Sequence, residues 1–278
     1  MLKQAIKNVV PRPILKKYEE VMDWRHFSTV PQKNFDVGNL RYASSLKASE
    51  ILIDPDIDHL WQEDHARIAK IFGELQYTFA VSPACRKAIY YLIMNLKPQS
   101  VLEIGTHVGG SSLYIAAALN RLGKGRKLTT VDIIDVNHQE YGPWRKIGLK
   151  KPPVEFAREL GFGEIIEFYT SRSDSFLRDS KQSFDLIFLD GDHSASTVYD
   201  ELSKSLSLIN RNGAVLLHDY YPDGKPLFQD SGLLIGPYRA LSRVRKENPA
   251  IEVLPLGQLP WATGQASDVT SLALVART

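Results

Sequence analysis

Five short and nearly continuous apolar runs between residues 100 and 219 constrain the fold of this chain more than any other feature. They are SVLEI (100–104), KLTTVDI (127–133), IIEFY (165–169), FDLIFLD (184–190) and AVLLHD (214–219). Runs of this kind are typical of strands that are buried on both faces, and the segments between them are long enough for crossover helices. The pattern predicts an α/β fold with a doubly wound, mostly parallel sheet.

The two ends of the chain differ from this central pattern. Near the C-terminus, the runs 251–256 and 271–276 are separated by a stretch with glycine and proline, which predicts an antiparallel hairpin at the edge of the sheet. Residues 1–50 contain no strand-like run, and helices are expected from Pro13 and over about 57–76. We therefore expect an N-terminal helical extension or cap over 1–80 and the main domain over 81–278.

Composition limits the classes of function. The chain has 278 residues, of which 44% are hydrophobic and 24% charged, so it can bury a large core. With 34 basic and 32 acidic residues, it has no overall charge that would attract nucleic acid. Its single cysteine, Cys85, fits a reducing compartment, so a cytoplasmic location is expected. No apolar run approaches 18 residues, so no transmembrane segment is expected. The helices expected near the N-terminus could also form the contact of a homodimer.

A glycine turn follows the first apolar run, at the place where open α/β sheets bind ligands. From Glu103 to Ser111 the sequence reads EIGTHVGGS. A dinucleotide fingerprint that begins at Gly105 requires a second glycine where His107 stands, and the imidazole would obstruct a pyrophosphate. Glu103 would also repel a pyrophosphate, whereas it suits a ligand with ammonium and sulfonium charges. These features favour S-adenosylmethionine over NAD.

Asp132 ends the second run, where a carboxylate can accept hydrogen bonds from both ribose hydroxyls of an adenosine group. NAD enzymes use an acid at the same point. Asp132 therefore predicts a ligand with an adenosine group but does not distinguish NAD from S-adenosylmethionine. Only the glycine turn favours one of the two. His107 is expected to shape the turn rather than to react.

Acids and histidines also gather at the ends of the fourth and fifth runs, as LDGDHS (189–194) and HDYY (218–221). Because parallel strands end on the same side of a sheet, these groups are expected beside the glycine turn. Asp190 and Asp219 would then be neighbours. A divalent cation, a cationic cofactor or a shared proton could relieve their repulsion.

Taken together, EIGTHVGGS, Asp132, LDGDHS and LLHDY resemble the motifs of class I S-adenosylmethionine-dependent methyltransferases. Over about residues 80–278 the chain is similar to small-molecule O-methyltransferases of the catechol, caffeoyl-coenzyme A and macrolide-sugar types. The resemblance implies a seven-stranded sheet of order 3-2-1-4-5-7-6, in which strand seven is antiparallel.

By position, the resemblance also implies the site residues. The cofactor-binding set is Glu103, Gly105, Thr106, His107, Gly109, Ser111, Asp132, Ser173, Asp174 and Asp190, with Ser173 and Asp174 at the adenine. The catalytic set is His193, Asp190 and Asp219. His193 stands where metal-dependent members carry a basic lysine, and its reference pKa of about 6.5 suits proton removal. A Mg²⁺ or Mn²⁺ site would use Asp190, His218 and Asp219, although this set departs from the family's usual acids.

We therefore predict an enzyme that transfers a methyl group from S-adenosylmethionine to a hydroxyl of a small molecule, such as a sugar, a polyketide or another natural product. His193 would be the general base. The alternatives are an NAD(P)-dependent oxidoreductase, a non-catalytic cofactor-binding or assembly protein, and a related cofactor-dependent hydroxylase component. A motif of the Asn/Asp-Pro-Pro-Tyr type is absent after the fourth run, which disfavours methylation of DNA amino groups.

Overall fold

The computed structural model describes residues 12–73, 81–227, 233–262 and 268–278. In this part of the chain the strands form one seven-stranded sheet of order β3-β2-β1-β4-β5-β7-β6. The first five strands are parallel, and β7 is antiparallel to both β5 and β6. The predicted fold class, strand order and edge hairpin are therefore confirmed. The strands are β1 (Ser100–Ile104), β2 (Lys127–Asp132), β3 (Ile166–Thr170), β4 (Phe184–Leu189), β5 (Ile209–Leu217), β6 (Ile251–Pro255) and β7 (Ala273–Arg277).

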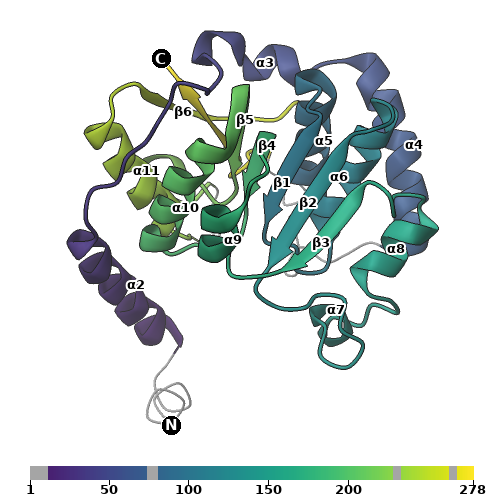
Figure 1. The fold of residues 1–278 in the computed structure, drawn as a ribbon, viewed down its shortest axis with the longest axis horizontal. Coiled ribbons are helices and arrows are strands. Elements are labelled where there is room, and N and C mark those ends of the chain that lie inside the picture. The colour runs from purple at the N-terminus through teal and green to yellow at the C-terminus, as the bar shows by residue number, and fades with distance from the viewer. Residues whose placement is uncertain (1–11, 74–80, 228–232, 263–267) are drawn as a thin grey trace.

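Helices cover both faces of the sheet (Figure 1). Successive strand residues alternate between two hydrophobic clusters, as expected for a strand between two helical layers: Val101 lies in one cluster and Leu102 in the other. One layer contains α4 (Pro55–Phe72), α5 (Pro83–Leu96), α6 (Gly110–Arg121) and α8 (Pro153–Glu159), and the other contains α9 (Ser173–Asp179), α10 (Ala195–Leu208) and α11 (Gly236–Glu247). The shorter elements are α3 (Ala48–Ile51), α7 (Pro143–Lys146) and the 3-10 turns η1 (Ala43–Ser45) and η2 (Pro222–Gly224).

The N-terminal helices differ in how they pack. α2 (Arg12–Thr29) begins close to the expected Pro13, but its large apolar side chains at Tyr18, Val21 and Met22 remain exposed. The second half of α2 contacts the main domain: Phe27 packs edge-on against Tyr199, with ring centroids 5.5 Å apart, and the carbonyl oxygen of Glu20 accepts a hydrogen bond from Arg239 at 3.2 Å. Figure 1 shows the rest of α2 leading away from the body of the molecule.

The second expected helix is α4, which starts at Pro55 and ends at Phe72 rather than extending to residue 76. The Asp54 side chain caps its start, and Gly73 ends it with a φ of +84°. Ile68 of α4 and Ile89 of α5 belong to the same hydrophobic cluster. α4 thus shares a core with the sheet, and the domain boundary near residue 81 stays a prediction. Among the described residues, no helix combines the length and apolarity that a bilayer crossing requires.

Candidate functional site

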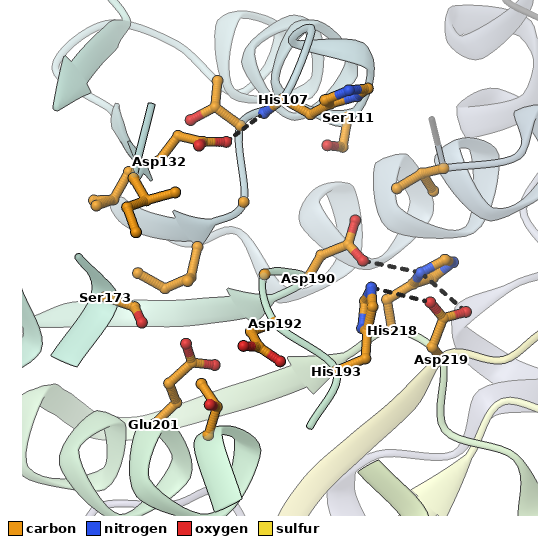
Figure 2. A pocket seen from close by; sticks show the side chains of 18 of the residues that line it. His107, Ser111, Asp132, Ser173, Asp190, Asp192, His193, Glu201, His218 and Asp219 are labelled. Carbon is orange, nitrogen blue, oxygen red and sulfur yellow. Dashed lines mark hydrogen bonds and ion pairs between the residues drawn. The ribbon is translucent and has the colours of Figure 1, made fainter. Parts of the chain in front are cut away.

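A cavity of about 700 Å³ opens at the carboxyl ends of β1, β2, β4 and β5 (Figure 2). β2 ends on Asp132 itself, and β4 and β5 stop just before their polar residues, so these side chains reach the cavity instead of the sheet core. The strands β4 and β5 end at Leu189 and Leu217, and the acids and histidines follow immediately. The polar lining includes Thr106, His107, Ser111, Asp132, Ser173, Asp190, Asp192, His193, Thr197, Glu201, His218 and Asp219.

The turn after β1 requires glycine at its first position. Gly105 has a φ of +103°, and a Cβ on it would lie only 2.2 Å from the carbonyl oxygen of Asp190. The backbone of β1 therefore passes directly against the end of β4. His107 also adopts a left-handed φ of +49°, and Gly109, at +78°, is the N-cap of α6. This strained path brings the His107 side chain to the cavity, as expected for a residue that shapes the turn.

Glu103 lies behind this turn and is not among the residues that line the cavity. Its carboxylate is fully buried and accepts hydrogen bonds from the hydroxyls of Ser111, Ser112 and Thr130. Burial raises the pKa of Glu103 to about 7, although the three hydroxyls oppose this shift. The side chain thus ties the end of β1 to the start of α6, and its charge can act on a ligand only through space.

Asp132 does line the cavity, and it joins the two turns beside it. One carboxylate oxygen accepts a hydrogen bond from the backbone N–H of His107 at 2.8 Å, and the other accepts from the N–H of Ile134 at 3.0 Å. Each oxygen keeps a further lone pair. Asp132 is therefore held in place and can still accept two hydroxyl groups.

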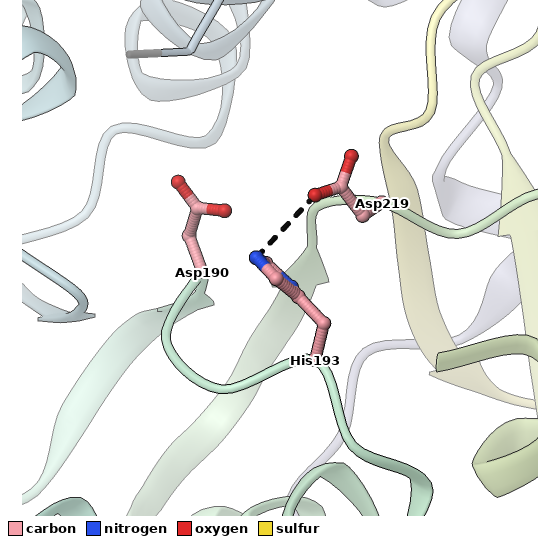
Figure 3. A group of neighbouring side chains, drawn as sticks. All are labelled: Asp190, His193 and Asp219. Atoms are coloured by element: carbon pink, nitrogen blue, oxygen red, sulfur yellow. Dashed lines mark ion pairs between the residues drawn. The ribbon is translucent and has the colours of Figure 1, made fainter. Parts of the chain in front are cut away.

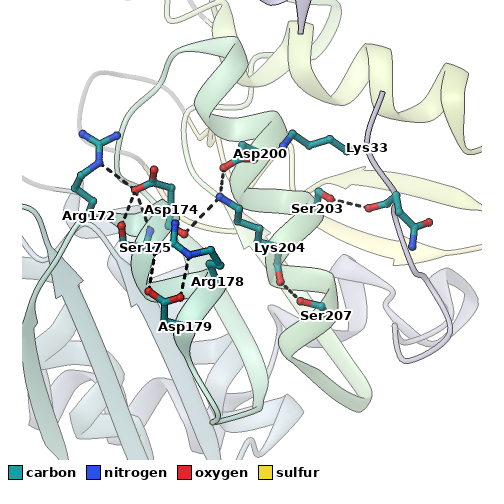
Figure 4. A network of polar contacts seen from close by, with 11 residues as sticks. Lys33, Arg172, Asp174, Ser175, Arg178, Asp179, Asp200, Ser203, Lys204 and Ser207 are labelled. Atoms are coloured by element: carbon teal, nitrogen blue, oxygen red, sulfur yellow. Dashed lines mark hydrogen bonds and ion pairs between the residues drawn. The ribbon is translucent and has the colours of Figure 1, made fainter. Parts of the chain in front are cut away.

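The remaining predicted cofactor residues divide into two groups. Gly105, Thr106, Ser111, Ser173 and Asp190 line the cavity, whereas Gly109 and Asp174 do not. The Asp174 carboxylate accepts from Arg172 Nε at 3.1 Å and from the Ser175 N–H at 2.9 Å, within a surface network shown in Figure 4. The bond from Arg172 lowers the pKa of Asp174.

The predicted catalytic and metal-binding residues come together at the other end of the cavity. His218 Nδ1 lies 3.0 Å from Asp190 Oδ1 and 3.4 Å from Asp219 Oδ1. His193 Nε2 lies 3.5 Å from Asp219 Oδ2 (Figure 3). The sequence expectation that these four side chains meet agrees with this geometry.

An imidazolium relieves the repulsion between the two aspartates. Burial opposes the charged form of His218, but the carboxylates of Asp190 and Asp219 raise its pKa well above 6.5. In return, although burial would raise the pKa of Asp219, the charge of His218 lowers it to about 2, and His193 adds to this effect. The cluster thus contains a positive charge supplied by the protein itself.

The donor set also fits a divalent cation. Asp190, His193 and Asp219 offer ligand atoms that all lie within 4.8 Å of one another. Carboxylate oxygens suit Mg²⁺, and a set with imidazole suits Mn²⁺ as well. This group contains His193 where the sequence analysis placed His218.

Asp192 belongs to the acid-histidine group that the sequence analysis expected here. The polar residues of the cavity wall that it did not include are Ser171, Arg172, Thr197 and Glu201. A signal for Glu201 exists, because it stands among the apolar positions of α10, between Val198 and Leu202. A carboxyl group on the buried face of a helix is rarely without a purpose.

Comparison with known proteins identifies the domain. Residues 102–220 match the family model described as "Methyltransferase domain". The chain contains a methyltransferase domain. The resemblance to class I S-adenosylmethionine-dependent methyltransferases that the sequence motifs indicated is thereby confirmed. The match to the family model begins in β1 and ends just after β5, so this methyltransferase domain includes both the glycine turn and the aspartate–histidine cluster.

Curated relatives and solved structures agree with this assignment. Over 158 residues, 57% of this chain, the sequence is 25% identical to rhamnosyl O-methyltransferase of Mycobacterium leprae and 27% identical to that of Mycobacterium tuberculosis. These matches span only 63% and 60% of the relatives' own lengths.

The fold is similar to that of two solved O-methyltransferases, each 18% identical in sequence. One is from Streptomyces achromogenes, is involved in tomaymycin synthesis and was solved with S-adenosylmethionine; its TM-score is 0.55, with 81% of this chain and 91% of that chain covered. The other is from Bacillus cereus and was solved with S-adenosylhomocysteine; its TM-score is 0.53, with 85% and 98% covered.

Proposed function

We propose that this protein transfers the methyl group of S-adenosylmethionine to a hydroxyl group of a small molecule. One observation carries the proposal: a single cavity has the carboxylate of Asp132 on one side and the group Asp190, His193 and Asp219 on another. Asp132 suits a ribose, and the group suits an activated hydroxyl. A methyl transferase needs both, because it must align a large cofactor and an acceptor oxygen in one place.

In this proposal the cofactor lies along the carboxyl ends of the strands. The ribose hydroxyls donate to Asp132, and the methionine end lies against the turn at Gly105 and Thr106. The sulfonium then faces Asp190, where the negative charges of the cluster and of Glu103 favour a cation. The cofactor product, S-adenosylhomocysteine, lacks that positive charge.

His193 is proposed as the general base. The acceptor oxygen attacks the methyl carbon in line with the breaking carbon–sulfur bond, and the bond electrons pass to sulfur. His193 takes the hydroxyl proton and later releases it to solvent. Asp219, 3.5 Å from His193 Nε2, holds the ring and stabilises its charged form. The sulfonium already activates the methyl group. The protein therefore has only to remove the proton, align the acceptor oxygen with the methyl carbon and exclude water.

Asp190 and Asp219, with His218 or His193 as the third donor, would hold Mg²⁺ or Mn²⁺. When bound, such an ion would orient the acceptor hydroxyl and lower its pKa. If His193 is the base, the third donor is His218, which would then bind the ion as neutral imidazole instead of carrying its own positive charge.

The acceptor is proposed to be a sugar hydroxyl or a hydroxyl of another natural product. The rhamnosyl O-methyltransferases to which the chain is similar support a sugar, but they match it over less than two thirds of their length.

Residues 1–80 are proposed to cap the site. Asp23 of α2 accepts a hydrogen bond from the backbone N–H of Ala195 at 3.2 Å, two residues after His193. The N-terminal segment thus supports the loop that carries the proposed base.

Binding measurements with the purified full chain test the function. We expect calorimetry to show binding of S-adenosylhomocysteine and no binding of NADH. Mass spectrometry of reactions with a panel of deoxysugars and phenols should show a gain of one methyl group. Binding of NADH alone would favour the oxidoreductase. Binding of S-adenosylhomocysteine without transfer to any acceptor class would favour the non-catalytic protein.

A further inference from the structure

The carboxyl group of Glu201 is a part of the cavity wall that the proposed chemistry does not use. α10 carries it inward, and the residue is only 1% exposed, yet it lines the cavity. Its Oε1 atom accepts no hydrogen bond from the described residues. An unpaired polar atom at such depth costs stability, so it requires an explanation.

On one side, this oxygen faces a glycine instead of a side chain. Gly191 lies beside it, and a Cβ on that glycine would be 3.8 Å from Glu201 Oε1 and 3.1 Å from the Ile104 side chain. The absence of a side chain at Gly191 keeps this side of the carboxyl group open. No Cβ at position 191 therefore obstructs a flat group on this side of the oxygen.

The position of Glu201 matches one end of the cofactor. Figure 2 shows it with Ser173 and Asp192, on the opposite side of the cavity from Asp219. If the ribose binds Asp132 and the sulfonium faces Asp190, the base extends toward Ser173 and Glu201. Ile133, which is 63% exposed and also lines the cavity, offers an apolar surface for a flat ring.

We propose that Glu201 recognises the adenine of the cofactor by accepting a hydrogen bond from its exocyclic N6 amino group. This inference rests on the proposed function and names a contact that the sequence motifs do not include. The N6 amino group is the hydrogen-bond donor on that edge of adenine, and a carboxyl group can accept from it whether it is protonated or ionised. Glu201 is thus a specificity-determining residue for the base.

A binding cycle tests the contact. The affinities of S-adenosylhomocysteine and of its analogue without the 6-amino group are measured by calorimetry for the wild type and for Glu201→Met, which keeps the length of the side chain. We expect the wild type to bind the analogue about tenfold more weakly. Glu201→Met should bind the two ligands equally. Glu201→Gln keeps a carbonyl oxygen and should retain the preference.

Asp132→Asn is the matched control. It should weaken the binding of both ligands by the same factor, because both contain the ribose. The ratio of the two affinities should stay at about tenfold. A wild type that binds both ligands equally would overturn the assignment of Glu201, even if Glu201→Met fails to fold. Equal ratios in the wild type and Glu201→Met would also overturn it. If the wild type binds neither ligand, the proposed function itself is wrong.

Discussion

Replacing Glu201 by Gln should change how the stability of the protein depends on pH. Burial raises the pKa of Glu201 to about 7, against an ordinary value of 4.5; a hydrogen bond from Ser173 opposes the rise, and the charge of Asp192 adds to it. The folded protein therefore holds a proton on Glu201 that the unfolded chain has already released. Its contribution to stability is fully present below pH 4.5 and is lost as the pH rises through about 7.

The magnitude follows from the shift. At ~1.4 kcal/mol per pH unit, the change from 4.5 to about 7 corresponds to ~3 kcal/mol, of which ~2.5 kcal/mol falls between pH 5 and pH 8. Urea unfolding across this range, followed by circular dichroism, should show that the wild type loses about that much more stability than Glu201→Gln. Other titrating groups are common to both proteins and cancel. The exposed Glu140, changed to Gln, should leave the wild-type profile unaltered. Parallel profiles for the wild type and Glu201→Gln would refute the reasoning.

Other variants test the site directly. Gly105→Ala places a Cβ 2.2 Å from a backbone oxygen and should cost ~3 kcal/mol or more in unfolding experiments, whereas Gly148→Ala, where a Cβ meets nothing within 4 Å, should cost ~1 kcal/mol; equal losses would contradict the close approach of β1 and β4. His193→Ala should lower kcat by about 100-fold or more while the Kd for S-adenosylhomocysteine stays within a factor of about two; an unchanged kcat at saturating acceptor would remove His193 from the mechanism. Asp132→Asn should raise the Kd for S-adenosylhomocysteine at least about tenfold, and an unchanged Kd would show that the ribose binds elsewhere. Chelation of divalent ions should abolish transfer, with recovery on addition of Mg²⁺ or Mn²⁺; full activity in EDTA would exclude the metal.

The sheet could be predicted from sequence because its strands are buried on both faces. The runs that begin at Val101 and Phe184 contain almost only apolar residues, and so short an apolar run is typical of a strand buried on both faces. The start of β5 was missed, because residues 210–213 are polar and β5 pairs with β4 there across an irregular register. The pattern of apolar residues reveals only the buried part of a strand, so it does not predict the exposed residues at which a strand begins.

The site could be predicted only as a set of strand ends. Parallel strands end on one side, so Asp132, Asp190 and Asp219 had to lie at the same edge of the sheet. The direction of each side chain could not be predicted. Glu103 turns to three hydroxyls and Asp174 to Arg172, and a residue pattern does not say which of several available donors a carboxylate will bind. Glu201 reaches the cavity because α10 packs beside β4. This contact belongs to the tertiary structure, and the sequence pattern of the helix alone does not reveal it.

The ring of His218 between Asp190 and Asp219 leaves that corner of the cavity with one net negative charge when all three groups are ionised. A sulfonium entering it is attracted, but the neutral thioether that remains after methyl transfer is not. Reactant and spent cofactor differ by one methyl group in shape and by a full unit in charge. In the proposed reaction, the corner can therefore distinguish the two by electrostatics, so each methyl transfer would weaken the binding of the spent cofactor and favour its exchange for a fresh one.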